Sequence, residues 1–290
     1  MDADRTLFWI PVRDYDLAAT LDCGQAFRWM KRGDAGAWEG IVDARWVRLR
    51  DRDGGIEAQT AVPIEDWAWL THHLQSEVDL ASVLQTFPGD EAMRASMEAC
   101  RGLRLLRQDP WECLASFILS STKQIVQIRQ IIGLLCSRFG APIAVPSGRE
   151  PMHAFPSAER LAAASEAELR ACKMGFRAPY LLATARRVAA GEVNLEGLGK
   201  RPVEEARAAL MELPGVGEKI ANCVLLFGCG FPQAFPVDVW VRKAIRELYF
   251  PKRRPTPRRF AHFVNSYFGS NAGYAQQYLF HYMRIRAGRR

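Results

Sequence analysis

The segment from Leu213 to Asp238, LPGVGEKIANCVLLFGCGFPQAFPVD, constrains the fold more than any other part of this 290-residue chain. Its Pro-Gly-Val-Gly start predicts a tight turn between two helices, because Gly215 and Gly217 can both take positive φ and let another backbone come close. Apolar residues then recur at roughly helical spacing, so residues 218–227 are expected to form a short amphipathic helix. Asp238 precedes a second helical pattern and is expected to be its N-cap.

The helix behind this turn carries the side chains that could react. Its N-terminus offers unpaired N–H groups and a positive dipole end, which suits a phosphate group. Lys219 lies in the first turn, where the dipole disfavours the protonated amine and so favours a nucleophilic role. Cys223 follows one helical turn later and could reach the same pocket, or be a small buried hydrophobe. The alternative for the whole segment is a glycine turn between packed helices, with a surface lysine and an ordinary cap.

The combination of glycine turn, lysine and aspartate resembles the helix-hairpin-helix DNA glycosylases, and the lysine is typical of their bifunctional glycosylase/lyase branch. The resemblance implies an α+β fold, with an N-terminal antiparallel β domain of the TBP-like kind packed on a mostly α-helical HhH-GPD glycosylase domain. We place the first domain at residues 1–105 and the second at residues 106–290, and the N-terminal helices could also pack with the second. The resemblance further assigns Lys219 and Asp238 to catalysis.

Composition limits the class of protein and its partner. No apolar run is long enough to span a membrane, and the N-terminus lacks the basic start and apolar run of a secretory signal. The seven cysteines show no Cys-x-x-Cys spacing, which is typical of reduced intracellular thiols. Residues 1–100 hold ten Lys/Arg against eighteen Asp/Glu, and the rest twenty-nine against fourteen, within a net charge of +7. The basic second part suggests a polyanion partner.

The chain from residue 8 to about residue 58 is expected to form an antiparallel β meander. Aromatic and branched runs at residues 27–29, 38–42, 46–49 and 56–58 alternate with turn clusters. The run GQAFRW at residues 24–29 is consistent with a strand entered through a glycine, but it also resembles the N-terminal segment of 8-oxoguanine DNA glycosylases. That resemblance implies that the Gly24 carbonyl accepts a hydrogen bond from N7–H, which the oxidised base has and guanine lacks. One unpaired polar contact costs about 1–3 kcal/mol, enough for much of the discrimination.

A polar loop between two helical patterns departs from the family. Where 8-oxoguanine glycosylases of the eukaryotic type carry asparagines, this chain has TKQ at residues 122–124, and Gln127 stands where they carry an arginine. Those side chains read the cytosine opposite the lesion in the family. We therefore assign Thr122 to DNA binding and expect a relaxed requirement for cytosine. Plain helix capping is the alternative.

A second loop joins helices that are expected at residues 158–172 and 178–190. Its glycine turn with an aromatic and an arginine resembles the family's wedge loop, which assigns Phe176 to insertion at a base step and Arg177 to reading the opposite base. The alternative is a core phenylalanine beside a solvated arginine.

The last helix, expected from about residue 274, presents Gln276 and Phe280 four residues apart on one face. In the matching segment of the family, the glutamine binds the Watson–Crick edge of the base and the phenylalanine stacks on it. Without the family, Phe280 would be assigned to the core. Upstream, the proline- and arginine-rich run at residues 250–259 could contact phosphate, resemble a nuclear signal or be merely solvated.

These assignments together predict a base-excision repair enzyme. It would flip 8-oxoguanine out of duplex DNA, displace it with Lys219 through a Schiff base, and cleave the strand by β-elimination, with Asp238 as an anion. Gly24, Cys223, Gln276 and Phe280 would bind the base, while Gly215 and Gly217 would hold phosphates. We expect no metal or organic cofactor, a monomer, and an intracellular location with DNA. The alternatives are a monofunctional glycosylase for alkylated purines and a non-catalytic DNA-binding hairpin module.

Overall fold

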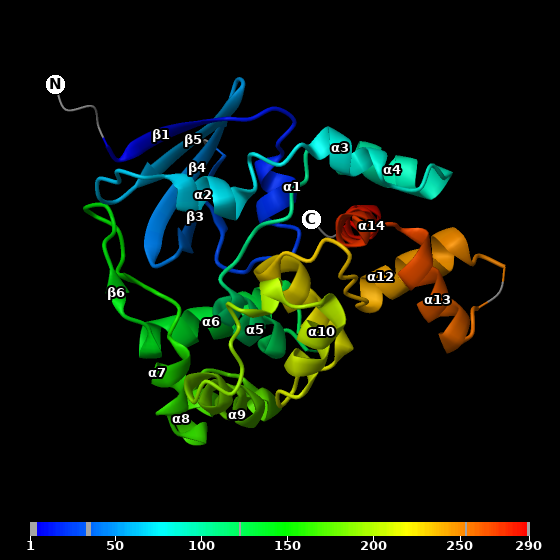
Figure 1. Ribbon diagram of the computed structural model, residues 1–290. Helices are drawn as coiled ribbons and strands as arrows, with labels where there is room; N and C mark the ends of the chain where they lie inside the picture. Colours follow the sequence, from blue (N-terminus) through cyan, green and yellow to red (C-terminus); the bar gives the residue numbers. More distant parts are fainter. Residues whose placement is uncertain (1–4, 33–35, 122, 253, 289–290) are drawn as a thin grey trace.

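A five-stranded antiparallel sheet forms one end of the molecule in the computed structural model, and helices form the rest (Figure 1). The structure describes residues 5–32, 36–121, 123–252 and 254–288. The strands lie in the order β1-β5-β4-β3-β2 and span Leu7–Pro11 (β1), Met30–Arg32 (β2), Ala37–Val42 (β3), Arg45–Arg52 (β4) and Gly55–Thr60 (β5). Asp43 and Ala44 both have positive φ and close the β3–β4 hairpin in the twist that such turns favour.

Apolar residues from the sheet and from two short helices form the first of two cores. Leu17 and Leu21 of α1 (Leu17–Leu21) and Leu70 and Leu74 of α2 (Ala68–Leu74) are buried in it together with Trp29. The helices therefore cover an apolar sheet face that could not be left in water.

The expected strand at residues 27–29 is wrong, because β2 begins only at Met30. This segment crosses from one core to the other. Phe27 packs edge-on against Phe117 of the helical part, with ring centres 5.5 Å apart, whereas Trp29 belongs to the core of the sheet. Side chains directed into two different cores leave no regular alternation for a strand to use.

The second core lies among the helices. Their bounds are Leu80–Gln85 (α3), Glu91–Ala99 (α4), Pro110–Leu119 (α5), Ile125–Phe139 (α6), Ala158–Ala162 (α7), Glu166–Ala171 (α8), Ala178–Ala189 (α9), Val203–Met211 (α10), Glu218–Cys223 (α11), Val239–Ala244 (α12), Pro257–Tyr267 (α13) and Ala272–Arg286 (α14). Short 3-10 helices span Gly175–Arg177 (η1) and Leu198–Lys200 (η2), π-helices span Val224–Cys229 (η3) and Ile245–Tyr249 (η4), and a two-stranded ribbon joins Pro142–Ile143 (β6) to Met152–His153 (β7).

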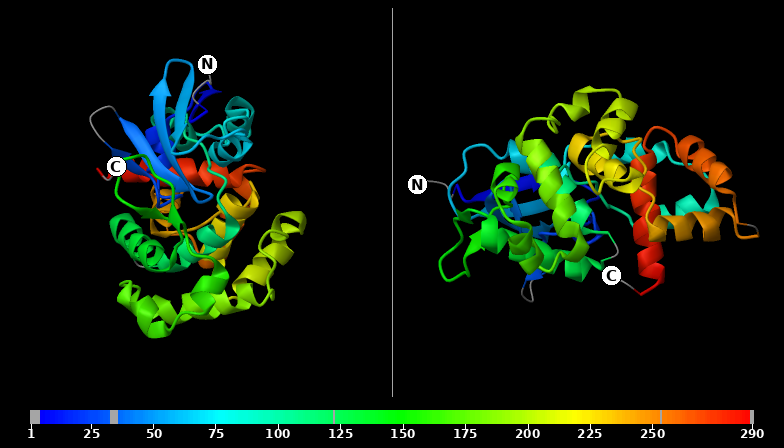
Figure 2. Two further views of the ribbon diagram at one scale, coloured as in Figure 1. Left: turned by 90° about the vertical axis from the view of Figure 1, so that its left-hand side faces the viewer. Right: turned by 90° about the horizontal axis from the view of Figure 1, so that it is seen from below.

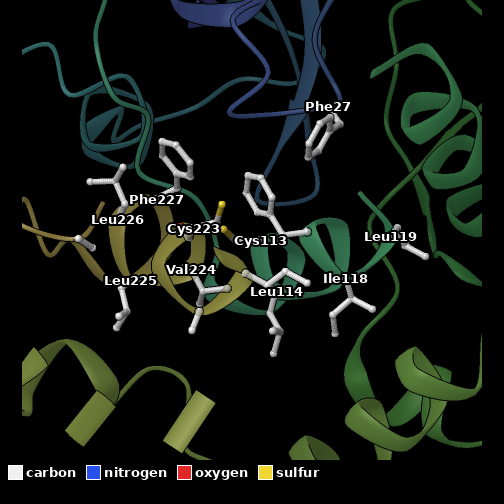
Figure 3. Close-up of a cluster of buried hydrophobic side chains, with 14 of the residues drawn as sticks. Phe27, Cys113, Leu114, Ile118, Leu119, Cys223, Val224, Leu225, Leu226 and Phe227 are labelled. Atoms are coloured by element: carbon white, nitrogen blue, oxygen red, sulfur yellow. Dashed lines mark hydrogen bonds between the residues drawn. The ribbon is translucent and has the colours of Figure 1, made fainter. Parts of the chain in front are cut away.

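Helices α5 and α11 with η3 lie side by side at the centre of this core, and Phe27 reaches them from the sheet side (Figure 3). Cys113 and Leu114 of α5 and Cys223 and Val224 of the α11–η3 helix are buried there. Two helices from the N-terminal half also belong to this core, because Met93 of α4 is fully buried in it and α4 packs on α14.

The single helix expected at residues 158–172 is two helices, α7 and α8. Ser165 interrupts it by starting a new capping box: its hydroxyl accepts from the backbone N–H of Glu168, and its own N–H donates to the Glu168 carboxylate. Such reciprocal capping stabilises a helix start at the residue where a longer helix would otherwise continue.

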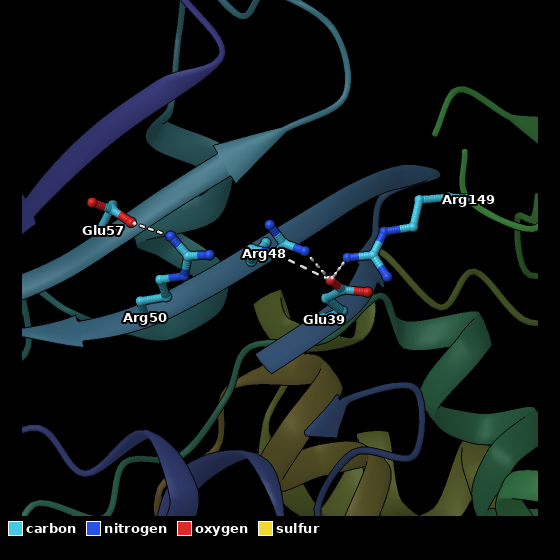
Figure 4. Close-up of polar contacts among 5 residues, drawn as sticks. All are labelled: Glu39, Arg48, Arg50, Glu57 and Arg149. Carbon is cyan, nitrogen blue, oxygen red and sulfur yellow. Dashed lines mark hydrogen bonds and ion pairs between the residues drawn. The ribbon is translucent and has the colours of Figure 1, made fainter. Parts of the chain in front are cut away.

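Arginine–carboxylate contacts join the sheet to the helical part. Buried Glu39 of β3 accepts from Arg48 of β4 at 2.7 Å and from Arg149, in the connection between β6 and β7, at 2.5 Å (Figure 4). Because this carboxylate is buried, loss of its partners would leave a costly unpaired charge.

None of the described helices has the length and apolar character needed to cross a bilayer.

Candidate active site

The glycine turn between α10 and α11 is present, and only one of its glycines needs positive φ. Gly215 has φ +78°, and a Cβ there would lie 2.8 Å from the Cβ of Tyr180, so the turn packs tightly on α9. Gly217 is extended, with φ −96° and ψ 178°, and serves as the N-cap of α11. Of the two glycines that can take positive φ, only Gly215 does so. Thr184 of α9 fixes the turn by donating to the Pro214 carbonyl at 3.0 Å.

Lys219 extends from the first turn of α11 towards the end of α5. Its Nζ donates to Ser120 Oγ at 3.1 Å and lies 5.0 Å from the ring centre of Phe117. The Ser120 hydroxyl donates to the Phe117 carbonyl at 2.7 Å, which leaves its lone pairs for the lysine. Ser120 is not among the site residues that the sequence predicts, because nothing local connects two residues 99 positions apart.

Asp238 is the N-cap of α12, as its sequence position predicts. Its Oδ1 accepts the backbone N–H of Val241 at 2.8 Å. Burial raises the pKa of this carboxyl above 3.8, and the Val241 N–H and the charge of Lys219 oppose that rise. The charge of Lys219 thus acts on the Asp238 carboxyl group within one partly desolvated site.

One cavity of about 710 Å³ brings most of the predicted site residues together. It is lined by Lys219, Asp238, Gly24, Cys223, Gln276 and Phe280. Gly215, Gly217, Phe176 and Arg177 do not line it, and Thr122 lies outside the described residues. The hairpin amine, the following carboxylate and the base-binding candidates from both ends of the chain thus face one space.

Cys223 contributes an uncharged wall to this cavity. Its side chain is buried, and burial raises the pKa of the thiol to about 11, although the charge of Lys219 opposes the rise. At neutral pH the group is a thiol and no thiolate competes with Lys219 as a nucleophile.

The Gly24 loop is held by its neighbour, Gln25, whose side chain is fully buried. The Gln25 amide donates to the carbonyls of Thr20 and Arg104, both at 2.8 Å, and accepts from the N–H of Leu106 at 2.8 Å. Gly24 itself has φ +81°, and a Cβ there would lie 2.9 Å from Ile125 Cδ1. A glycine is needed at this position, because a side chain would be strained and would press on the α6 wall of the cavity.

Helix α14 presents a face of three residues at i, i+4 and i+8 to the cavity. The Oε1 atom of Gln276 is buried and has no hydrogen-bond partner among the described residues. Phe280 follows, and behind its ring lies the guanidinium of Arg284, 5.6 Å from the ring centre. Arg284 also donates to the carbonyl of Asp22 at 3.2 Å, which ties this helix to the Gly24 loop. Arg284 is not among the site residues predicted from the sequence, although the continued four-residue spacing is a usable signal.

The loop between α8 and α9 contradicts the alternative of a core phenylalanine beside a solvated arginine. Phe176 is 55% exposed, so it is no core residue and protrudes as a wedge would. Arg177 is only 2% exposed and lies over the Phe176 ring, 4.2 Å from its centre. It is therefore not a solvated charge, and a contact with an opposite base would require it to leave this position.

Groups of ionisable side chains do not assemble elsewhere into a metal site: within the described ranges, no three His, Cys, Asp or Glu side chains are arranged to hold an ion. All seven cysteines are free thiols, and six of them are buried.

A helix-hairpin-helix fold with an amine and a carboxylate facing one base-sized cavity defines the class of this protein. Comparison with known families identifies this class. Residues 8–114 match the family model described as the N-terminal domain of 8-oxoguanine DNA glycosylase, and residues 115–268 match that of HhH-GPD superfamily base excision DNA repair proteins. The chain belongs to this HhH-GPD superfamily and carries the N-terminal domain of its 8-oxoguanine branch.

Individual relatives align over nearly the whole chain. It is 34% identical to the N-glycosylase/DNA lyase OGG1 of Arabidopsis thaliana, over 94% of this chain and 79% of the relative. It is 30% identical to a probable N-glycosylase/DNA lyase of Methanothermobacter thermautotrophicus, over 95% of each. A crystal structure of the Clostridium acetobutylicum 8-oxoguanine glycosylase/lyase with DNA containing cytosine opposite 8-oxoG has a TM-score of 0.88 and 31% identity, over 94% of this chain and 93% of that one. The predicted family and fold class are thus confirmed.

Proposed function

We propose that this protein excises 8-oxoguanine from duplex DNA and cleaves the resulting abasic strand, with Lys219 as nucleophile and Asp238 as the charged partner. Relatives named N-glycosylase/DNA lyase support the reaction class. The observation that carries the substrate assignment is the unpaired Gln276 Oε1, buried in the cavity that Lys219 and Asp238 also line. A buried acceptor without a partner costs about 1–3 kcal/mol, so a ligand with a matching donor is expected there.

The edge of the base fits this acceptor. Purine lactams such as 8-oxoguanine present N–H donors beside a carbonyl on their Watson–Crick edge, and the Gln276 amide offers an acceptor beside a donor. In this proposal Phe280 supplies the stacking surface, and the Gly24 carbonyl accepts N7–H of the oxidised base. The cavity is closed to a base inside the double helix, so the nucleotide is flipped out first.

The chemistry follows from the amine and the carboxylate. The lone pair of Lys219 Nζ attacks C1′ while the bond from C1′ to the base breaks and its electron pair leaves with the base, which then takes a proton. Loss of the amine proton and opening of the sugar give the Schiff base. Removal of a C2′ proton then expels the 3′ phosphate. Asp238, as an anion, stabilises the positive charge that develops on the sugar and relays protons.

Borohydride trapping on an 8-oxoguanine duplex tests this function. We expect base release together with a covalent protein–DNA adduct of the reduced Schiff base. Base release without an adduct would indicate a monofunctional glycosylase, and binding with neither would indicate a DNA-binding module.

The same assay with each of the four bases opposite the lesion tests the relaxed partner preference, which a strong preference for cytosine would contradict. The place of action is with DNA, in the nucleoid of a bacterial cell or the nucleus of a eukaryotic one.

Replacing Gln276 by leucine separates substrate recognition from folding. We expect single-turnover excision of 8-oxoguanine to fall about 10- to 100-fold, because the base loses its partner. Thermal stability should stay equal or rise, because the substitution removes a buried oxygen that has no partner. The matched control is Gln277→Leu: its side chain is equally buried, but its amide donates to the Cys23 carbonyl at 3.3 Å, so it should lose stability. A stability loss in both variants would contradict the assignment of Gln276 to the ligand.

A further inference from the structure

A second hollow, of about 690 Å³, adjoins the catalytic cavity and has a strongly basic wall. Its cations are Arg242, Lys243, Arg246, Lys252 and Arg254, all exposed, and we call it the basic groove. Val239 and Arg242 line both hollows, so the basic groove begins where the catalytic cavity ends.

The charge of the basic groove is largely uncompensated by the protein. Its one acid, Glu247, lies 3.8 Å from Lys243. Within the described part of the chain, no carboxylate lies within ion-pair distance of Arg246, Lys252 or Arg254. In the sheet, by contrast, Arg50 forms an ion pair with Glu57 (Figure 4). Clustered cations repel one another, and such a wall is stabilised when it meets an anion.

The wall is also built on a fixed platform. The hydroxyls of Tyr249 and Tyr267 both donate to Asp90 at the start of α4, at 3.4 and 2.9 Å. Phe250, which lines the groove, packs edge-on against Phe263 with ring centres 5.2 Å apart. The guanidinium of Arg242 lies 5.2 Å from the ring centre of Phe260. Cations presented from an anchored surface lose little entropy when they bind.

The dimensions of the basic groove fit a DNA backbone. Val239, Arg242 and Lys243 lie on α12, the helix that Asp238 caps, and Arg246 follows on η4, which continues directly from it. Seven residues of helix advance about 10 Å, which equals about three base steps at 3.4 Å each. Lysine and arginine side chains hold phosphates without reading sequence, which a lesion-specific enzyme requires on its flanks.

We propose that the basic groove binds the sugar–phosphate backbone of the duplex over about three nucleotides on one side of the flipped base. This inference rests on the proposed function, which supplies the flipped nucleotide at the end of α12. It accounts for the proline- and arginine-rich run after η4, whose described residues complete the wall.

Salt dependence of DNA binding tests the basic groove. The variant Arg246→Gln/Lys252→Gln/Arg254→Gln removes three cations, and the control Arg5→Gln/Arg45→Gln/Arg52→Gln removes three exposed arginines from the sheet end. Figure 1 and the right-hand view of Figure 2 show the sheet and the α12–α13 region at opposite ends of the molecule. Binding is measured on a duplex with a stable abasic-site analogue, between 50 and 200 mM salt. The association constant falls with salt, and the slope of its logarithm against the logarithm of the salt concentration counts the phosphate contacts. Each lost contact should reduce this slope by about 0.9, which makes the loss of affinity between 50 and 200 mM salt about 3.5-fold smaller.

We expect the groove variant to lose between about one and three units of slope while the control keeps the wild-type value. Trimming the duplex on one side of the lesion should weaken wild-type binding and leave the groove variant almost unaffected. Equal slopes for the groove variant and wild type, or equal losses in both triple variants, would overturn the inference. Binding is measured on an uncleavable duplex and does not depend on catalysis. If the groove variant loses slope but the wild type excises no 8-oxoguanine, the proposed function alone is rejected.

Discussion

Replacing Lys219 by glutamine is expected to abolish the borohydride-trapped adduct and to slow base release by about 10³-fold or more. Glutamine keeps a polar end that can still donate to Ser120, but its amide nitrogen has no lone pair available for attack. The substitution removes the bond to C1′ and therefore both chemical steps, while the cavity keeps its shape. The measurement is single-turnover base release together with trapping on an 8-oxoguanine duplex.

The matched control is Lys123→Gln, because Lys123 lines the same cavity as Lys219. Unlike Lys219, Lys123 lies in the loop before α6 and not in the first turn of a helix. Trapping should survive in this variant, and both variants should show wild-type far-ultraviolet circular dichroism. An adduct that persists in Lys219→Gln and disappears in Lys123→Gln would assign the nucleophile to Lys123 instead. An adduct in both variants would exclude each lysine as the sole nucleophile.

The parts of the site predicted from the sequence are those that local spacing encodes. Asp238 as a helix cap, and Gln276 with Phe280 on one helical face, follow from rules that act within a few residues. Ser120 could not be found in this way, because its contact with Lys219 depends on how α5 packs against α11. Long-range packing of this kind leaves no periodic signal in either segment.

The errors in the predicted fold have the same origin. Residues 27–29 have the composition of a strand, but their side chains are divided between the core of the sheet and the helical core. The sequence around Arg177 predicts a DNA-contacting or solvated arginine, yet this side chain is buried against an exposed aromatic ring. In both cases the tertiary environment overrides a local preference.

Replacing Asp238 by asparagine is expected to separate catalysis from stability. Asparagine is as good an N-cap as aspartate, so the bond from the Val241 N–H and the start of α12 should persist. The anion that faces the developing charge on the sugar is lost, and removal of one such electrostatic partner costs about 10²–10³ in rate. Single-turnover excision measures the loss. Rescue of the rate by Asp238→Glu, which restores the charge, is expected only in part because the longer side chain disturbs the cap.

The raised pKa of Asp238 determines how both the excision rate and the stability of the protein should change with pH. The active form is the carboxylate, so the rate should fall as pH is lowered towards a value above 3.8, and Asp238→Asn should lack this acid limb. Stability runs the other way: the folded protein holds the proton more tightly than the unfolded chain, so this group's contribution is lost as pH rises from 3.8 through the raised pKa. Asp238→Asn should therefore be at least as stable as the wild type at neutral pH. As pH is lowered, the difference in stability between the two proteins should shift in favour of the wild type. An asparagine variant that unfolds more easily at neutral pH would show that the carboxylate is retained for folding and not for chemistry.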